Sequence, residues 1–348
     1  MLNTTRKTEL SFHVLEEIGQ EGKNSQVYLA TDLQLDADIV VKKILKNKIA
    51  SVDEYFLEAS MLYLSSHPNV VPIYYACQDE EHIYLAMPYF EKGSLKSRLQ
   101  NKYISVREII TYSTQILSGL HNIHSKRLIH FDVKLDNVLI SERNEALLSD
   151  FGLTKQISYS GVVGQDRIYG TMTPPEAFRT NEFCQKFDIY QFGVTLHRMC
   201  VGDNSFYSEF NSFVENGSVN RARFQHAVVN GQFPNRGNYP EHIPQALINT
   251  IRGCLSVDLG ERYSSAIDIV NHLSEIDGHL LDWYWTYNDT GSAWRKQLPD
   301  GRSYELLVNP DGSSNANRTS ANNNTQRIRD YCKPNINRAE IKRFLRSF

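Results

Sequence analysis

The sequence predicts an α+β protein with a small N-terminal β-sheet that carries one helix, a larger and mainly helical second part, and a C-terminal extension. Short runs of β-branched and aromatic residues, separated by turn residues, fill the chain up to about residue 88. From residue 94, apolar residues instead recur at the spacing of a helix. The length of 348 residues allows two structural units, or one large domain with an appendage.

The N-terminal part, residues 11–88, is expected to hold several strands and one helix. The helical pattern covers residues 52–66, where Ser51 at the N-cap and Glu54 at the third helical position match a capping box. Pro68 ends this pattern. The predicted strands cover residues 11–18, 26–32, 37–45, 70–78 and 82–90.

The second part, residues 91–278, is expected to be mainly helical. Its clearest helix covers residues 106–125, where Ile109, Tyr112 and Ile116 belong to an apolar stripe. We expect strands in this part only in a hairpin around residues 138–149. Further helices are predicted at residues 94–100, 186–200, 221–230, 244–255 and 264–276.

The strongest signal for chemistry is the run His-Phe-Asp-Val-Lys-Leu-Asp-Asn, followed by Asp-Phe-Gly. Asp132 of this run can orient a reacting hydroxyl and accept its proton, and Lys134 can neutralise a phosphoryl group in transfer. Asn137 and Asp150, brought together by a hairpin, can hold Mg²⁺ against triphosphate oxygens. The pattern resembles the catalytic and metal-binding loops of eukaryotic-type serine/threonine protein kinases.

This resemblance implies a two-lobed protein-kinase fold that binds ATP with Mg²⁺, or Mn²⁺ in its place, and acts on a protein substrate. It assigns Lys42 to the α- and β-phosphates, held there by an ion pair with Glu58 on the helix that follows. A glycine-rich turn should precede this lysine. Gly19, Gly22 and Ser25 supply the turn, with a spacing one residue longer than the family's and with Ser25 in place of the third glycine.

The same resemblance implies an adenine pocket and an apolar stack. Met87 falls at the gatekeeper position behind the adenine, and Tyr89 lies in the hinge that follows. The residues expected to line the adenine are Val27, Val40 and Leu139. The residues expected to form the apolar stack of an assembled kinase are Leu62, Ile73, His130 and Phe151.

Motifs in the C-terminal half extend the resemblance over residues 11–278. Thr173-Pro174-Pro175-Glu176 looks like the end of the activation segment, and the helix that includes Asp188 resembles the one that anchors the catalytic loop. Arg262 matches the arginine that pairs with the glutamate of that segment, so we expect an ion pair between Arg262 and Glu176. Each of these residues alone would read as an ordinary loop or surface residue, but independent motifs in one order make the match specific.

Lys134 and Thr171 match the serine/threonine class, in which that threonine can bond to Asp132 and Lys134. Phe131 replaces the arginine that commonly precedes the catalytic aspartate, so a phosphate on the activation segment lacks its usual partner. We therefore hypothesise that activity does not depend strictly on phosphorylation of this segment. The end of the segment is also about two residues shorter than usual, which leaves the docking of a peptide substrate open.

Two alternatives to an active protein kinase stay open. A pseudokinase or scaffold would ordinarily lack one of the catalytic residues, all of which are present here. A small-molecule phosphotransferase of the aminoglycoside-kinase type shares the His-x-Asp and Asn pattern. Such an enzyme is not expected to combine that pattern with Pro-Pro-Glu, the Asp188 helix and Arg262.

The C-terminal extension, residues 279–348, resembles no family that we recognise. It holds all three tryptophans and a predicted hairpin turn at Pro299-Asp300-Gly301. The polar residues 309–326 are predicted to form a flexible linker, followed by two short basic helices broken at Pro334. These pieces either pack onto the large lobe or form a module that binds a partner or nucleic acid. The apolar face of the helices is expected to comprise Ile328, Ile336, Ile341, Phe344 and Leu345.

The net charge of −3 is an average over two unlike parts. From Arg295 onward the chain carries 11 basic and 5 acidic residues, whereas the remainder carries 26 basic and 35 acidic residues. An acidic kinase domain therefore precedes a basic tail, residues 295–348. We expect this tail to bind its own kinase domain, an acidic partner or nucleic acid.

The composition favours a cytoplasmic protein without a membrane partner. No apolar run approaches the ~20 residues that span a bilayer, and the N-terminus lacks the apolar core of a signal peptide. The cysteines lie far apart without the spacing of a zinc site or a disulfide framework, which fits a reducing intracellular compartment. They are Cys77, Cys184, Cys200, Cys254 and Cys332.

Overall fold

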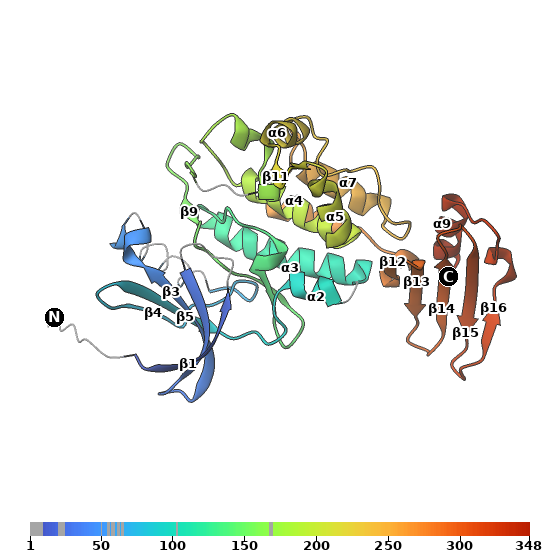
Figure 1. The fold of residues 1–348 in the computed structure, drawn as a ribbon, viewed down its shortest axis with the longest axis horizontal. Coiled ribbons are helices and arrows are strands. Elements are labelled where there is room, and N and C mark those ends of the chain that lie inside the picture. The colour runs from blue at the N-terminus through green and yellow to red at the C-terminus, as the bar shows by residue number, and fades with distance from the viewer. Residues whose placement is uncertain are drawn as a thin grey trace. The chain divides into compact units, whose positions relative to one another are not determined.

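The computed structural model describes residues 10–19, 25–49, 51–53, 56, 60, 63, 66–101, 104–166 and 170–348. The chain forms two compact units, which Figure 1 shows as ribbons. The small unit comprises Met1–Lys92 and Leu139–Ser149, and the large unit comprises Gly93–Val138 and Asp150–Phe348. Strands dominate the small unit and helices dominate the large unit up to Ser274, so the predicted α+β class is confirmed.

The small unit is built on a five-stranded antiparallel sheet in the order β1-β2-β3-β5-β4. Ala30, Ile39, Val41 and Ala86 are buried together on one face of this sheet. The strands agree with the predicted ones, except that β4 is shorter than expected. Their bounds are β1 Phe12–Gly19, β2 Ser25–Asp32, β3 Ala37–Leu45, β4 Tyr75–Gln78 and β5 His82–Pro88.

The hairpin of β7 (Val138–Ile140) and β8 (Ala146–Leu148) groups with the small unit, although we expected it in the helical part. Backbone hydrogen bonds explain the grouping. The amide of Val71 donates to the carbonyl oxygen of Leu148 at 2.8 Å, and the amide of Leu148 donates to that of Asn69 at 3.0 Å. These contacts join segments far apart in the sequence, which no local pattern reveals.

The predicted helix 52–66 falls largely outside the described residues. Val52, Asp53, Phe56, Ser60 and Tyr63 have helical backbone, as the pattern predicts.

The large unit holds the helices that the apolar periodicity predicts, with boundaries that differ by a few residues. Their bounds are α2 Leu95–Asn101, α3 Val106–Ser125, α4 Lys186–Val201, α6 Arg221–Val229, α7 Gln245–Cys254 and α8 Ala266–Ser274. A capping box between Ser105 and Glu108 starts α3. Among the described residues, no helix combines the length and apolar character needed to cross a bilayer.

Helix α4 lies at the centre of the large unit, since every residue from Phe187 to Val201 is buried. A helix that is enclosed on all sides needs close neighbours. Gly193 permits such an approach, because a Cβ at this position would lie 2.7 Å from the Cβ of Cys254 on α7. The residues of the candidate functional site are positioned by this enclosed helix.

The prediction that the large lobe has strands only around residues 138–149 was wrong. The large unit holds two further short ladders outside that hairpin. It also holds a helix that was not predicted, α5 (Asp203–Asn211), which follows α4. Ladders of two residues per strand are too short to show a periodicity in the sequence. The ladders pair β6 (Leu128–Ile129) with β9 (Lys155–Gln156) and β10 (Val214–Glu215) with β11 (Ser218–Val219).

The prediction of a flexible linker at residues 309–326 was also wrong. This stretch contains two strands of a five-stranded antiparallel meander. The turn at Pro299-Asp300-Gly301 lies between β13 and β14, as predicted. The bounds are β12 Tyr284–Asn288, β13 Gly291–Gln297, β14 Ser303–Val308, β15 Ser314–Thr319 and β16 Thr325–Arg327.

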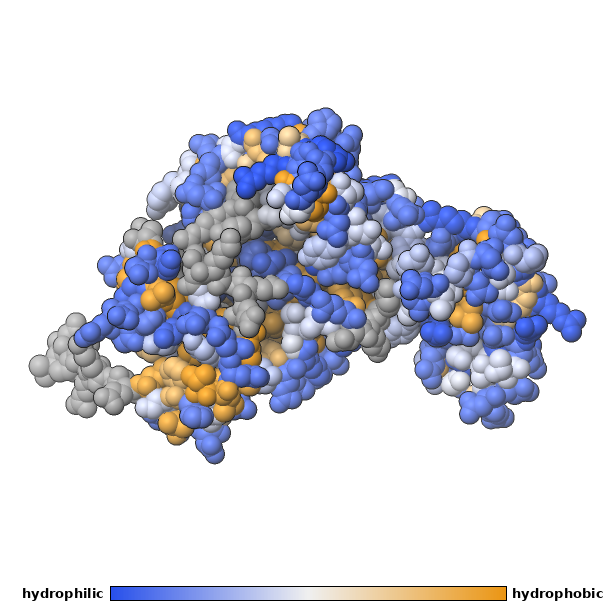
Figure 2. Space-filling view, in the orientation of Figure 1, coloured by the Kyte–Doolittle hydropathy of each residue, from blue (hydrophilic) through white to orange (hydrophobic). Residues whose placement is uncertain are grey.

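The polar composition of β15 is compatible with a strand because only one face of this sheet is covered. Register aligns Trp285, Trp294, Leu306 and Ala316 across four strands, so a single apolar side chain of β15 lies centrally in the buried row. Polar side chains of the strand find partners elsewhere in the module: the hydroxyl of Ser314 donates to the carbonyl oxygen of Tyr331 at 2.8 Å, and Arg318 donates to Gln326 of β16 at 2.7 Å. The visible surface of this module is mostly hydrophilic, as Figure 2 shows.

Helix α9 (Arg338–Ser347) covers the apolar face of the meander and completes what we call the C-terminal module, residues 279–348. The predicted apolar face is confirmed, since Ile336, Ile341, Phe344 and Leu345 are buried in one cluster and Ile328 packs against it. The indole nitrogen of Trp283 donates to the carbonyl oxygen of Leu345 at 2.9 Å. The first of the two predicted helices is only a single 3-10 turn, Arg329–Tyr331, before Pro334.

Phe344→Ala tests whether this module is folded. The substitution is expected to lower the free energy of unfolding by about 3–5 kcal/mol, because it leaves a cavity beside Trp283. Urea denaturation followed by tryptophan fluorescence measures the change. Arg343→Ala, on the exposed side of α9, is the matched control and should change stability by less than about 0.5 kcal/mol. Equal stability of the two variants would contradict the packing described here.

Candidate functional site

The loop that begins at His130 is held by one buried carboxylate. Asp188, in the first turn of α4, is fully buried. Its Oδ2 accepts the backbone N–H of His130 and its Oδ1 accepts that of Phe131, each at 2.8 Å. The Nε2 of His124, at the end of α3, lies 2.8 Å from the same Oδ2. The carboxylate therefore ties α3, α4 and the loop together.

Two further residues of α4 also contact the backbone of this loop. The Oε1 of Gln191 accepts the backbone N–H of Val133 at 2.9 Å, and its Nε2 donates to the carbonyl oxygen of Phe131 at 3.0 Å. The hydroxyl of Thr195 lies 3.3 Å from the carbonyl oxygen of Val133. Because Phe131 has a φ of +64°, a conformation that side chains rarely adopt, these bonds hold a strained loop in place.

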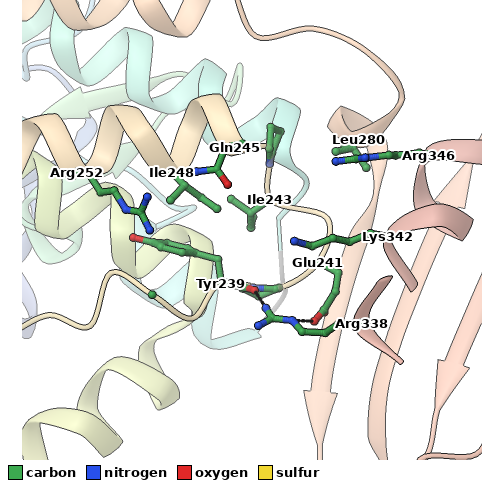
Figure 3. Close-up of a pocket in the computed structure, with 13 residues that line it drawn as sticks. Tyr239, Glu241, Ile243, Gln245, Ile248, Arg252, Leu280, Arg338, Lys342 and Arg346 are labelled. Carbon is green, nitrogen blue, oxygen red and sulfur yellow. Dashed lines mark hydrogen bonds and ion pairs between the residues drawn. The ribbon is translucent and has the colours of Figure 1, made fainter. Parts of the chain in front are cut away.

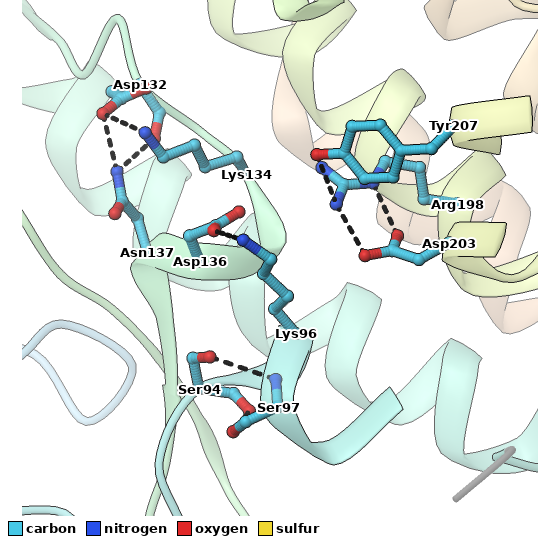
Figure 4. Close-up of polar contacts among 10 residues, drawn as sticks. All are labelled: Ser94, Lys96, Ser97, Asp132, Lys134, Asp136, Asn137, Arg198, Asp203 and Tyr207. Atoms are coloured by element: carbon cyan, nitrogen blue, oxygen red, sulfur yellow. Dashed lines mark hydrogen bonds and ion pairs between the residues drawn. The ribbon is translucent and has the colours of Figure 1, made fainter. Parts of the chain in front are cut away.

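Two polar side chains of the loop, those of Lys134 and Asn137, converge on Asp132, as Figure 4 shows. The amide nitrogen of Asn137 donates to the Oδ2 of Asp132 at 2.8 Å and to its carbonyl oxygen at 2.9 Å. The ammonium group of Lys134 lies 3.1 Å from the same Oδ2. These contacts fix the rotamer of Asp132, and they direct the amide oxygen of Asn137 away from it.

Lys134 lies in a cluster of carboxylates. Burial acts to lower the pKa of its ammonium group, but the negative charges of Asp132, Asp136 and Asp150 outweigh burial and raise the pKa overall. Lys134 is therefore a stable cation at neutral pH. Asp136 is itself paired with Lys96 of α2, with an N–O distance of 2.5 Å.

Asn137 and Asp150 fit the requirements of a magnesium ion. Both offer oxygen ligands, which Mg²⁺ prefers. Asp150 is exposed, and its own backbone has a φ of +56°. The described residues contain no group of three or more His, Cys, Asp or Glu side chains arranged for a metal ion. Mg²⁺ sites commonly use one or two protein carboxylates and take the remaining ligands from substrate phosphates and water.

Phe131 lies in an apolar cluster instead of at a charged site. Its ring makes edge contacts with Phe183 and Phe187, with centroids 6.0 and 4.9 Å away. Leu153 and Val163, from the chain between Asp-Phe-Gly and Pro-Pro-Glu, pack against the same cluster. Aromatic contacts therefore join the loop to this segment at the position where the kinase family commonly has an arginine.

The predicted pair of Arg262 and Glu176 is confirmed. The two guanidinium nitrogens Nη1 and Nη2 lie 2.7 and 2.9 Å from the two carboxylate oxygens, and the guanidinium lies over the ring of Tyr190. Arg262 is almost fully buried. A bidentate buried pair of this kind fixes the end of the segment against α4.

The hydroxyl of Thr171 makes no hydrogen bond to Asp132 or Lys134 within the part of the chain that the structure describes. Thr173 instead closes the local turn, because its hydroxyl donates to the carbonyl oxygen of Gly170 at 2.8 Å. Of the predicted apolar stack, His130 and Phe151 are in contact, with ring centroids 4.8 Å apart. Leu62 lies outside the described residues, and the role of Ile73 stays a prediction.

In the small unit, the sheet register places four predicted nucleotide contacts on one face. Val27 opposes Lys42 and Val40 opposes Met87. Opposed residues of antiparallel strands lie on the same side, and residues two apart on a strand share a face. Val27, Val40, Lys42 and Met87 therefore share the face opposite the buried cluster around Ile39.

The remaining predicted residues of the small unit are described in part. Tyr89 and Leu139 are half-buried in this unit. Gly19 ends β1 opposite Val27, and Ser25 begins β2 opposite Ile44. Gly22 and Glu58 lie outside the described residues, so the phosphate loop and the Lys42–Glu58 ion pair stay predictions.

Residues 12–273 match the family model described as protein kinase domain. This match covers more than half of the chain and includes the anchored loop, both predicted metal ligands and the Glu176–Arg262 pair. The chain belongs to the protein kinase family. Its similarity to serine/threonine kinases, which the motifs indicate, is confirmed by relatives of that name.

Among these relatives, a probable serine/threonine-protein kinase of Clostridium acetobutylicum is 28% identical over 279 residues, which cover 78% of this chain and 40% of the relative. The serine/threonine-protein kinase PrkC of Bacillus subtilis is 27% identical over 74% of this chain and 39% of its own length. The serine/threonine-protein kinase Nek5 of Mus musculus is 32% identical over 57% of this chain. The chain thus spans about two fifths of the bacterial relatives.

The sequence motifs assigned no contact with this loop to three residues that position it: His124, Gln191 and Thr195, although Gln191 lies in the motif of the anchoring helix. His124 lies in the last turn of α3, and Gln191 and Thr195 are polar residues of the buried helix α4. The available signal was the polarity of Gln191 and Thr195 in a helix expected to be buried. A buried polar side chain needs a hydrogen-bond partner, but the sequence does not name that partner.

Asp188→Asn tests the anchor of the loop. An amide offers one acceptor oxygen, so its NH₂ group would face a backbone N–H that has lost its partner, at a cost of about 1–3 kcal/mol. We expect a lower kcat for phosphoryl transfer at a temperature where the variant is still folded. Chemical denaturation and steady-state kinetics measure the two effects separately.

The matched control for this variant is Asp203→Asn, which leaves one acceptor oxygen for the two contacts of 2.8 and 2.9 Å with the buried Arg198 and does not alter the loop (Figure 4). It should lose stability and keep kcat. A similar kcat for Asp188→Asn and the control would contradict the positioning role of Asp188.

Proposed function

We propose that this chain is an ATP-dependent serine/threonine protein kinase, which transfers the γ-phosphoryl group of Mg-ATP to hydroxyl groups of a protein substrate. The observation that carries the proposal is the convergence of Lys134 and Asn137 on the carboxylate of Asp132. The relatives named serine/threonine-protein kinases support the class.

In this proposal Asp132 orients the substrate hydroxyl and accepts its proton, because its carboxylate is held in one rotamer. Lys134 stabilises the charge that develops on the phosphoryl group, since its raised pKa keeps it protonated. Asn137 and Asp150 would hold Mg²⁺, which supplies charge neutralisation for the triphosphate when bound.

The small unit would bind the nucleotide. Lys42 would contact the α- and β-phosphates, held by Glu58, and the turn of Gly19, Gly22 and Ser25 would cover the phosphates. The face that carries Lys42 also carries the apolar side chains proposed to contact the adenine, namely Val27, Val40 and Met87, with Tyr89 and Leu139 completing the pocket.

Asp132→Ala tests the proposal. Radiolabelled ATP with the wild-type protein should label a protein acceptor or the kinase itself. The variant should lose most of this transfer, on the order of 10²–10⁴-fold, because the group that orients the hydroxyl is absent. Asp300→Ala, on an exposed hairpin, is the control and should retain wild-type transfer.

The same experiment separates the alternatives. ATP binding without transfer to any acceptor would favour a pseudokinase or scaffold. Transfer to a small molecule alone would favour a phosphotransferase of the aminoglycoside-kinase type. Either result would contradict a protein kinase.

We also propose that activity does not depend strictly on phosphorylation of the activation segment. The aromatic cluster of Phe131, Phe183 and Phe187, together with Leu153 and Val163, supports this idea, because it provides apolar contacts to the segment without a phosphate. Replacement of the usual arginine also removes the charge that would bind such a phosphate.

Alanine variants at Thr154, Ser158, Ser160 and Thr173 test this proposal. Each should retain transfer within about threefold of the wild type, which corresponds to less than about 1 kcal/mol in the activation barrier. Mass spectrometry identifies which sites are autophosphorylated. Loss of activity on substitution of a site that is autophosphorylated would refute the idea. Thr171→Ala is read separately, because the family resemblance assigns Thr171 to the catalytic site.

A further inference from the structure

A cavity of about 140 Å³ in the large unit lies between the loop before α7 and helix α9. Figure 3 shows that Tyr239, Glu241 and Ile243 come from that loop and Arg252 from α7, while Arg338, Lys342 and Arg346 come from α9. The catalytic loop contributes no residue to its lining. The cavity is therefore separate from the proposed phosphoryl-transfer site.

Four cations line the cavity. Arg338, Lys342 and Arg346 are four residues apart along α9, which places them on one side of the helix. Arg252 adds a fourth positive charge from another element. Glu241 is the one acidic residue among those that line the cavity, so the lining carries a surplus of positive charge.

Only part of this charge is neutralised. The Nε of Arg338 lies 2.6 Å from Glu241, and its Nη2 donates to the carbonyl oxygen of Tyr239. Lys342 and Arg346 have no partner among the residues that Figure 3 draws. Like charges held close together repel one another unless an anion lies between them.

Arg236, one residue before Gly237 of the cavity wall, adds to the local field. Its Nε and Nη2 are buried and have no hydrogen-bond partner within the described part of the chain. Burial lowers its pKa, and the neighbouring cations Arg262 and Arg252 lower it further. The cavity thus lies in a region where cations outnumber anions.

The rest of the lining indicates what kind of anion fits. Ile243, Ile248 and Leu280 are apolar and border the cations. An aromatic surface for stacking bases is absent from the described lining, since Tyr239 is only 4% exposed. Trp283 and Trp294 are buried in the core of the C-terminal module, and the partly buried Trp285 and the exposed Tyr287 do not line the cavity. This combination favours a single phosphate with apolar neighbours over a nucleic-acid backbone.

We propose that this cavity binds the phosphate group of a phosphorylated peptide segment. Arg338, Lys342 and Arg346 contact the phosphate oxygens with charge-assisted hydrogen bonds, and the flanking apolar residues of the peptide contact Ile248 and Leu280. The site draws on both the kinase domain and the C-terminal module, so the bound peptide also holds these two parts together.

The test is isothermal titration calorimetry of the full-length chain with a short peptide that carries phosphoserine between isoleucines. We expect saturable binding that becomes at least about tenfold weaker in the double variant Lys342→Gln/Arg346→Gln, because two charge-assisted contacts are lost. Arg343→Gln removes a cation from the same helix outside the cavity and should leave the affinity unchanged.

Three further probes decide between sources of the anion. The unphosphorylated peptide should not bind. Inorganic phosphate alone should bind more weakly than the phosphopeptide, and equal affinity would overturn the assignment to a peptide. Tighter binding of a single-stranded oligonucleotide than of the phosphopeptide would also overturn this assignment. An equal loss of phosphopeptide affinity in the double variant and in Arg343→Gln would overturn it too.

This experiment measures binding and needs no phosphoryl transfer. Absence of the proposed kinase activity would therefore not contradict the phosphopeptide site, and absence of phosphopeptide binding would not contradict the kinase activity. Circular dichroism of each variant establishes that the chain is folded before affinities are compared.

Discussion

The carboxylate of Asp188 is the interaction on which the candidate site depends. It accepts two backbone N–H groups of the catalytic loop and contacts His124, in an enclosed position on α4. A buried carboxylate without partners would be costly, but here each oxygen has a donor. The loop therefore takes its strained conformation from a helix that begins more than fifty residues later in the chain.

The positions of the other catalytic groups follow from this anchor. Once the loop backbone is held, Lys134 and Asn137 reach the same oxygen of Asp132. The carboxylates around Lys134 keep it protonated, and Lys134 in turn offsets their mutual repulsion. The three carboxylates outnumber the two ammonium groups of Lys134 and Lys96, and each charged group limits the orientation of the next.

The C-terminal module extends the kinase fold with a second apolar core. It contacts the kinase part of the large unit through ion pairs, since Arg107 binds Asp282 with two hydrogen bonds and Arg338 binds Glu241. These contacts support the interpretation that the extension packs onto the large lobe. The basic residues that the sequence concentrates in the tail gather in part around one cavity, where α9 presents three of them on one side.

The sequence by itself determined the kinase motifs, their order, and most helices and strands, because periodicity and motif spacing are local properties. The Arg262–Glu176 pair followed from the resemblance to protein kinases that those motifs carry. Only the tertiary structure decided that residues 309–326 pair as strands, since one inward-facing alanine and a backbone ladder leave no hydrophobic pattern to read. Only the tertiary structure also brought Gln191 and Thr195 to the catalytic loop and Arg252 to α9. Hydrogen bonds and charge clusters between distant segments depend on how helices pack, and a linear sequence does not record that packing.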